Sequence, residues 1–203
     1  MGNIVMQPQL DFFFFIGSTY TYLSVSRVGE IARRGISLRW RPFSVRVIMR
    51  EQNNIPFDGK PVKLRYMGRD VERRAGRYGI PFASIPAYPV DPDELANRVA
   101  VVASREGWCS EFTRAAYNAW FIDNKMPGDL ESTRNLLSDL DKNPDATIDR
   151  ANSGEIRDAY PKATDAARRL GIFGSPTFTC GSEIFWGDDR FEDAVDWAIA
   201  RRD

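Results

Sequence analysis

The sequence contains no histidine among its 203 residues. Histidine supplies the base in Ser-His-Asp and Cys-His nucleophile pairs, many metal ligands, and most acid–base groups that titrate near neutral pH. Its absence excludes these nucleophile pairs and all histidine-based metal sites. We therefore expect no metal centre in this chain.

Cysteine is nearly as scarce, because Cys109 and Cys180 are the only two and neither belongs to a CxxC motif. A dithiol oxidase is therefore disfavoured. The sequence leaves a disulfide between them open, but a reducing cytoplasm favours two free thiols. We expect Cys180 to pack in or beside a strand as a small hydrophobic residue.

An excess of charge and a long apolar run are also missing. The chain has 28 basic and 28 acidic side chains, so it shows no electrostatic footprint for nucleic acid or anionic lipid. The apolar run Leu10–Ile16 is too short to span a bilayer and lacks a signal-peptide cleavage pattern. The sequence predicts a soluble, cytoplasmic protein with no nucleic-acid or membrane partner, and its 43% hydrophobic content suffices for a sizeable core.

The N-terminal part reads as strand, helix, strand. The run Leu10–Ile16 is typical of a strand buried on both faces, and Gly17–Ser18–Thr19 interrupts it. An apolar stripe predicts a helix over Tyr20–Arg34, followed by an alternating strand at Ile36–Trp40. Such a unit places its two strands parallel in one sheet.

The C-terminal part predicts a helix that ends near Gly171, two short strands, and a last helix. The strands are Thr177–Cys180 and Ile184–Trp186, and the last helix begins around Gly187–Asp189. Pro176 opens the first strand, where proline needs a special reason because it has no N–H to donate.

A cis bond between Ser175 and Pro176 would supply that reason. It would leave the N–H and the carbonyl of Ser175 free to pair with an extended peptide. The alternative is an ordinary trans-proline turn.

Residues 45–160 are predicted to be mostly helical. A basic helix with an apolar stripe covers Lys63–Tyr78, Val45–Asn54 has no clear preference, and Ile80–Pro92 should be irregular because it holds four prolines. Further helices are expected around residues 95–106, 112–120, 130–140, 147–152 and 160–170. We predict an α/β fold in which a thioredoxin-like sheet domain, residues 1–44 and 161–203, carries an all-helical insertion, residues 45–160.

In such a fold the loop Gly17–Tyr20 faces the loop that holds Pro176. A helix N-terminus has free N–H groups and a positive partial charge, so it stabilises an anion. Thiol oxidoreductases place a cysteine here, whereas this chain has Ser18. Without a histidine Ser18 is not an activated nucleophile, but its hydroxyl can donate to an external thiolate, for which glutathione is the natural cytoplasmic source. Such a bond contributes roughly 1.5–3 kcal/mol and lowers a bound thiol's pKa by about one to two units. In the alternative, Ser18 only caps the helix.

Two further charged groups are candidates for ligand binding. Asp188 and Asp189 stand at a predicted helix start, where one is expected as the N-cap and the second as a partner for a peptide's ammonium group. Lys63 and Arg65 match a ligand carboxylate, or form a solvated charged face.

Together these segments resemble the 2-hydroxychromene-2-carboxylate isomerases, which are similar to the kappa-class glutathione transferases. The resemblance runs nearly end to end, and its motifs are weak singly but fairly specific in combination. The matching segments are Asp11–Phe14, Ser18, Tyr22–Leu23, Pro61–Tyr66, Tyr78–Pro81, Phe173–Thr177 and Phe185–Arg190.

The resemblance implies glutathione as the cofactor and a homodimer. Ser18 matches the serine that hydrogen-bonds the sulfur, and Ser175 before the cis-proline Pro176 matches the backbone that pairs with the cysteinyl part. The remaining implied contacts are Asp188 and Asp189 to the γ-glutamyl end and Asn54 and Lys63 near the glycyl end.

The activity that the resemblance implies is cis–trans isomerisation of a small aromatic enone acid by reversible thiolate addition. A glutathione transferase or peroxidase is the first alternative, and a thioredoxin-like module that binds peptides without turnover is the second. Phe43, Tyr66 and Tyr88 would line the pocket for a planar substrate, or belong to the core. One departure is Thr19, which replaces the family's usual proline and restores an N–H and a hydroxyl at the first helical position.

Overall fold

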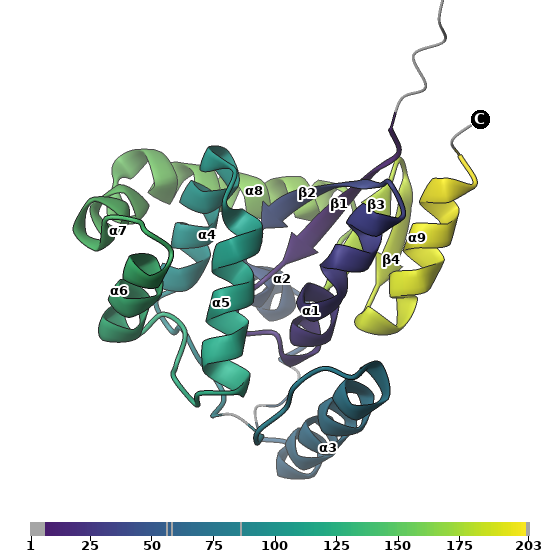
Figure 1. Cartoon of the computed structure of the whole chain (residues 1–203), viewed down its shortest axis with the longest axis horizontal. Coiled ribbons are helices and arrows are strands. Elements are labelled where there is room, and N and C mark those ends of the chain that lie inside the picture. Colours follow the sequence, from purple (N-terminus) through teal and green to yellow (C-terminus); the bar gives the residue numbers. More distant parts are fainter. Residues whose placement is uncertain (1–6, 56, 58, 86, 202–203) are drawn as a thin grey trace, which may run out of the picture.

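The structure is a computed structural model that describes residues 7–55, 57, 59–85 and 87–201. At its centre lies a four-stranded sheet with strand order β2-β1-β3-β4 (Figure 1). β1 pairs parallel to β2 and antiparallel to β3, and β3 pairs antiparallel to β4. The strands are β1 (Gln9–Phe14), β2 (Ser37–Pro42), β3 (Thr177–Cys180) and β4 (Glu183–Trp186).

β1 is the central strand, and its aromatic residues alternate between two cores. Phe12 and Phe14 point into the larger core, where Phe12 stacks on Phe178 of β3 with ring centroids 4.7 Å apart. Phe13 points to the opposite face and packs against Phe43. A near-continuous apolar run is what a strand buried on both faces requires, which confirms the prediction for this segment.

Helices cover both faces of the sheet. α1 (Thr19–Arg33) and α9 (Phe191–Ile199) pack on the larger-core face. α2 (Val45–Glu51) and the C-terminal part of α8 (Gly154–Arg169) pack on the other. In Figure 1, α1 lies in front of the sheet and α2 behind it. The thioredoxin-like architecture predicted from the sequence is therefore present.

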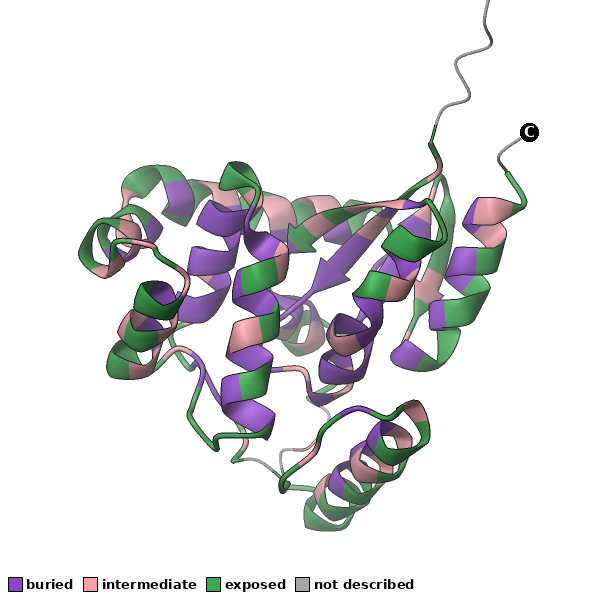
Figure 2. Ribbon diagram, viewed as in Figure 1, coloured by how far each residue is buried: buried purple, intermediate pink, exposed green. Residues whose placement is uncertain are grey.

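Among the described residues, the connection between the two halves of the sheet consists of helices joined by loops and contains no strand. After α2 come α3 (Pro61–Tyr78), α4 (Leu95–Glu106), α5 (Cys109–Phe121), α6 (Leu130–Asp139) and α7 (Pro144–Asn152). Figure 2 shows that the buried residues of α4 and α5 face each other and the sheet, whereas α3 is exposed over most of its surface. α8 runs continuously across residue 161, so the domain boundary placed there stays a prediction.

Three elements differ from expectation. α8 begins at Gly154, earlier than the helix expected around residues 160–170. Val45–Glu51, which had no clear preference, forms helix α2 because Val45 and Ile48 pack against the Phe13 face of β1. The last helix is preceded by a short 3-10 helix, η1 (Asp188–Arg190). Within the described part of the chain, no helix has the length and apolar character needed to cross a bilayer.

Candidate functional site

A cavity of about 610 Å³ lies where the loop after β1 meets the segment before β3. We call it the main cavity. Its walls come from residues 15–20, from α2, from Ile55, Phe57 and the start of α3, from Tyr88–Pro89, and from Ser175 and Trp186. Ser18, Ser175 and Lys63, three of the residues selected from the sequence, therefore share one cavity.

Ser18 and Ser175 contact each other directly. The Ser18 hydroxyl donates to the carbonyl of Ser175 at 2.7 Å, although the two residues are 157 positions apart. Ser18 occupies the N-cap position of α1, as the alternative interpretation expected, but its side chain makes no capping bond to the helix. The expectation that the Ser175 carbonyl is free is wrong, because the carbonyl accepts this hydroxyl.

Ser175 is held in place from several sides. The peptide bond between Ser175 and Pro176 is cis, as predicted, and Pro176 itself is buried. The N–H of Phe15 donates to the Ser175 hydroxyl at 3.0 Å, and that hydroxyl shares a second hydrogen bond with Thr21 at 2.9 Å. The N–H of Ser175 donates to none of the described residues. The Ser175 side chain is thus held by hydrogen bonds within the protein, whereas its N–H is left available.

Two buried polar residues of the helical region fix the loop that carries Ser18. The Tyr117 hydroxyl lies 2.9 Å from the carbonyl of Phe15 and 3.0 Å from that of Ser18. Asn97 exchanges hydrogen bonds with both the N–H and the carbonyl of Ile16, each at 2.8 Å. Sequence reasoning missed both residues. The available signal was a polar or hydroxylated side chain on the apolar stripe of a helix, where it needs a partner.

The main cavity is lined by cations and, among its described lining residues, by no carboxylate. Arg46 donates to the carbonyls of Asp91, at 2.5 Å, and Val90, and its guanidinium carbon lies 4.8 Å from the ring centroid of Phe15. Arg50 and Lys63 form no ion pair within the described part of the chain. Such unpaired cations suit a ligand that carries carboxylates.

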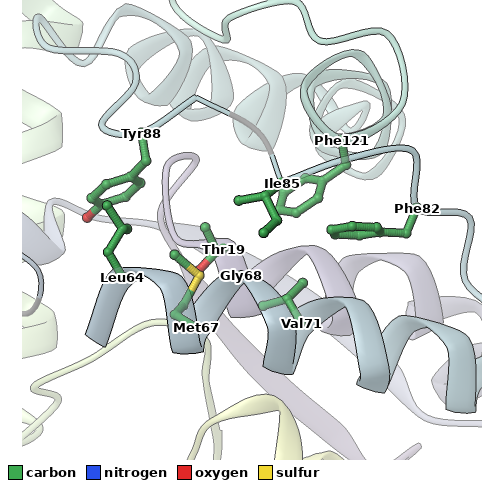
Figure 3. Close-up of a pocket in the computed structure, with 9 residues that line it drawn as sticks. All are labelled: Thr19, Leu64, Met67, Gly68, Val71, Phe82, Ile85, Tyr88 and Phe121. Atoms are coloured by element: carbon green, nitrogen blue, oxygen red, sulfur yellow. The ribbon is translucent and has the colours of Figure 1, made fainter. Parts of the chain in front are cut away.

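A smaller apolar pocket of about 80 Å³ adjoins the main cavity (Figure 3). We call it the side pocket. It lies between α3 and the side chains of Phe82, Ile85 and Tyr88, and it shares Thr19, Leu64 and Tyr88 with the main cavity. Of the three aromatic residues proposed to line a substrate pocket, only Tyr88 does so. Phe43 is fully buried in the core and Tyr66 is exposed outside both cavities, so these two assignments are wrong.

Asp188 does not line either cavity. It is 1% exposed, and Arg74 Nη2 of α3 lies 2.7 Å from its Oδ2. Burial raises the pKa of Asp188 to about 7, and the attraction of Arg74 offsets only part of that cost. Its oxygens accept no well-aligned hydrogen bond from any described residue, so Asp188 is not a helix cap as expected.

Asp189 and Asn54 also lie outside the cavity walls. Asp189 is exposed and pairs with Arg190 at 3.3 Å, and it caps neither η1 nor α9, so that expectation is wrong as well. Asn54 is exposed, and its N–H donates to the carbonyl of Met49 at 2.8 Å. Contacts from these residues to a ligand stay predictions.

Both cysteines are free, as expected. Burial raises the pKa of the Cys109 thiol to about 12, which excludes a thiolate there at neutral pH. Cys180 lies in β3, and neither sulfur reaches the two cavities.

Residues 9–197 match the family model of the DSBA-like thioredoxin domain. The chain belongs to this family. This membership agrees with the thioredoxin-like architecture described above.

Within the DSBA-like family, the chain is similar to named enzymes along most of its length. It is 28% identical over 190 residues to the 2-hydroxychromene-2-carboxylate isomerase of Sphingobium xenophagum, covering 92% of this chain and 96% of that protein. It is 24% identical to glutathione S-transferase kappa 1 of Caenorhabditis elegans, covering 91% and 88%. A solved 2-hydroxychromene-2-carboxylate isomerase superposes with a TM-score of 0.83 at 27% identity, covering 95% of each chain. These likenesses agree with the resemblance that the motifs indicate.

Proposed function

We propose that this protein is a glutathione-dependent cis–trans isomerase of the 2-hydroxychromene-2-carboxylate type that acts on a small aromatic enone acid, as a homodimer. The observation that carries the proposal is the contact of Ser18 with Ser175 at the N-terminus of α1, inside a cavity with three cations. The names of the relatives support the reaction class and the use of glutathione.

The residues present fit glutathione. The free N–H of Ser175 and its outward carbonyl provide the donor and acceptor that an extended peptide needs. Arg50 and Lys63 suit its carboxylates. We propose Asn54 beside Lys63 at the glycyl end, and Asp189 with Asp188 toward the γ-glutamyl end. Since Asp188 is buried against Arg74, we expect only the exposed Asp189 to reach the ammonium group directly.

Ser18 must change its partner when the tripeptide binds. A hydroxyl has one proton, and Ser18 donates it to the Ser175 carbonyl. A peptide N–H that donates to the same carbonyl replaces this hydroxyl, which then turns toward the sulfur. The hydroxyl and the N-terminus of α1 together stabilise the negative charge of the sulfur.

Bound glutathione supplies a thiolate whose reversible addition turns a conjugated double bond into a single bond that can rotate. The chain's own residues orient both molecules: Ser18 holds the sulfur, Arg50 and Lys63 attract the acid group, and Tyr88 provides an aromatic wall. A kappa-like transferase would use the same site but would leave the sulfur on the electrophile.

The test compares wild type with Ser18→Ala by calorimetry and by thiolate absorbance as a function of pH. We expect wild type to bind reduced glutathione, and Ser18→Ala to raise the pKa of the bound thiol by about one to two units. Turnover of an arylidene 2-oxo acid should therefore fall about 10- to 100-fold at neutral pH, and less at high pH where the thiol ionises without help.

Ser26→Ala is the matched control, because Ser26 also lies on α1 but donates to the Tyr22 carbonyl away from the cavity. Wild type that takes up no glutathione would refute the proposal. Uptake followed by conjugation of 1-chloro-2,4-dinitrobenzene, without isomerisation, would favour the transferase. Uptake with neither reaction would favour a binding module.

A further inference from the structure

Thr19 carries a hydroxyl that the fold leaves without a partner. The residue is 4% exposed, and its hydroxyl forms no hydrogen bond with any residue that the structure describes. It lines the side pocket, whose other walls include Met67, Val71 and Phe121. Figure 3 shows the Thr19 side chain pointing toward α3. Because Thr19 lines both cavities, its unpartnered hydroxyl is available to donate to a ligand there.

Further donors surround this hydroxyl. Thr19 is the first residue of the 15-residue helix α1, where the N–H groups have no acceptor within the helix. The N–H of Ser18 donates to Phe15 and that of Thr21 to Ser18, but those of Thr19 and Tyr20 donate to none of the described residues. The positive end of α1, two backbone donors and one hydroxyl therefore meet beside Ser18.

We propose that Thr19 forms an oxygen-binding subsite for the carbonyl of the substrate's enone, a contact that rests on the proposed function. During thiolate addition one electron pair enters the new C–S bond, the C=C pair shifts toward the carbonyl carbon, and the carbonyl pair becomes a negative charge on oxygen. Expulsion of the thiolate reverses these three movements. The Thr19 hydroxyl and the N–H groups at the start of α1 donate to that oxygen while it is charged.

The volumes of the two cavities indicate which part of the substrate each one can hold. An apolar cavity of about 150 Å³ holds benzene, so the side pocket of about 80 Å³ takes only the edge of an aryl group. The rest of the ring and the acid group lie in the main cavity, with its unpaired Arg50 and Lys63. Thr19 lines both cavities and lies between the ends of such a substrate.

A binding experiment without glutathione tests the subsite on its own. The probes are 4-phenyl-2-oxobutanoate and 4-phenylbutanoate, which differ only in the keto oxygen, titrated into wild type, Thr19→Val and Thr19→Ser. We expect Thr19→Val to lose about tenfold in affinity for the keto acid and less than twofold for its partner. Thr19→Ser, which keeps the hydroxyl, should stay within about threefold of wild type. Equal losses for the two acids, no loss, or no binding of either acid to wild type would overturn the proposal.

The kinetic arm separates this inference from the proposed function. Thr19→Val should bind glutathione as wild type does but turn over an arylidene 2-oxo acid about 10- to 100-fold more slowly. Unchanged turnover in Thr19→Val would overturn the Thr19 role while leaving the isomerase proposal intact. Absence of glutathione binding in wild type would overturn the isomerase proposal. The affinities of the two probe acids would still test the role of Thr19.

A thermal melt checks that the substitution leaves the fold intact. Since Val is isosteric with Thr and no hydrogen bond is lost, the melting temperature of Thr19→Val should stay within about 2 °C of wild type or rise.

Discussion

Burial of one carboxylate, that of Asp188, makes the stability of the folded protein depend on pH. Asp188 lies between α3 and α9, faces Arg74 at 2.7 Å, and is influenced by Arg27, Asp70 and Asp189. Desolvation dominates these interactions, so the pKa of Asp188 in the folded protein is raised from 3.8 to about 7. The folded state therefore holds this proton more tightly than the unfolded state does.

The raised pKa of Asp188 makes the protein less stable as the pH rises. Between about pH 4 and pH 7 the folded state binds more protons at Asp188 than the unfolded state, so this residue makes the free energy of unfolding fall as the pH rises. Its contribution is fully present below about pH 4 and is lost above about pH 7, with a total change of about 4 kcal/mol.

Asp188→Asn should remove this contribution, because Asn does not titrate. Urea unfolding from pH 4.5 to 8 should show a wild-type free energy that declines relative to the variant across that window. Asp189→Asn is the control, since Asp189 is exposed, and its profile should parallel that of wild type. An Asp188→Asn profile that also parallels wild type would show that Asp188 does not titrate there.

At the scale of the element, α3 forms a wall of both cavities, although only a few of its residues are buried against the rest of the protein. Its buried residues are Met67, Gly68, Val71 and Ala75. Polar contacts also attach α3 to neighbouring elements: the Arg74–Asp188 ion pair joins it to η1, and a hydrogen bond of 3.0 Å from Tyr20 to Asp70 joins it to α1. The position of α3 therefore sets the shape of the side pocket.

Two glycines of α3 offer a matched pair of substitutions. A Cβ at Gly76 would meet no atom within 4 Å, whereas one at Gly68 would lie 2.7 Å from a methyl carbon of Ile85. Gly76→Ala should raise the free energy of unfolding by about 0.5–1 kcal/mol, because alanine has the higher helix propensity. Gly68→Ala gains the same propensity but must displace Ile85, so it should be less stable than Gly76→Ala by at least about 1 kcal/mol. Chemical denaturation measures both values, and equal stabilisation would mean that Ile85 moves away without cost.

At the scale of the whole molecule, the main cavity joins parts that are distant in the chain. Ser18 and Ser175 come from the two halves of the sheet, and Lys63 comes from α3. A ligand that spans them holds these parts together and favours the folded state by mass action.

Glutathione at about 100 times its dissociation constant should stabilise the protein by about 2.7 kcal/mol. For a chain of this length the melting temperature should rise by about 5–10 °C. Ser18→Ala at the same glutathione concentration should show a smaller rise, whereas Ser26→Ala should show the full one. A melting temperature that glutathione leaves unchanged in wild type would contradict the proposed site.

Much of the fold was predictable because its signals are local. The strand Thr177–Cys180 and the helix over Lys63–Tyr78 follow from short apolar patterns bounded by proline and glycine. The placement of Ser18 and Ser175 in one cavity followed from the topology expected for those elements. α2 was not predictable from its own residues, because its helical state depends on packing against β1.

The sequence by itself determined most of the strand and helix pattern, the lack of histidine and dithiol chemistry, and the serine that stands at the start of α1. Only the tertiary structure decided that Ser18 donates to Ser175, that Asp188 is buried beside Arg74, and that the Thr19 hydroxyl bonds to none of the described residues. The physical reason is that the two kinds of property depend on residues at different separations along the chain. Periodicity and turn chemistry act between neighbours in the chain, whereas a side chain's hydrogen-bond partner and solvation depend on residues up to 157 positions away.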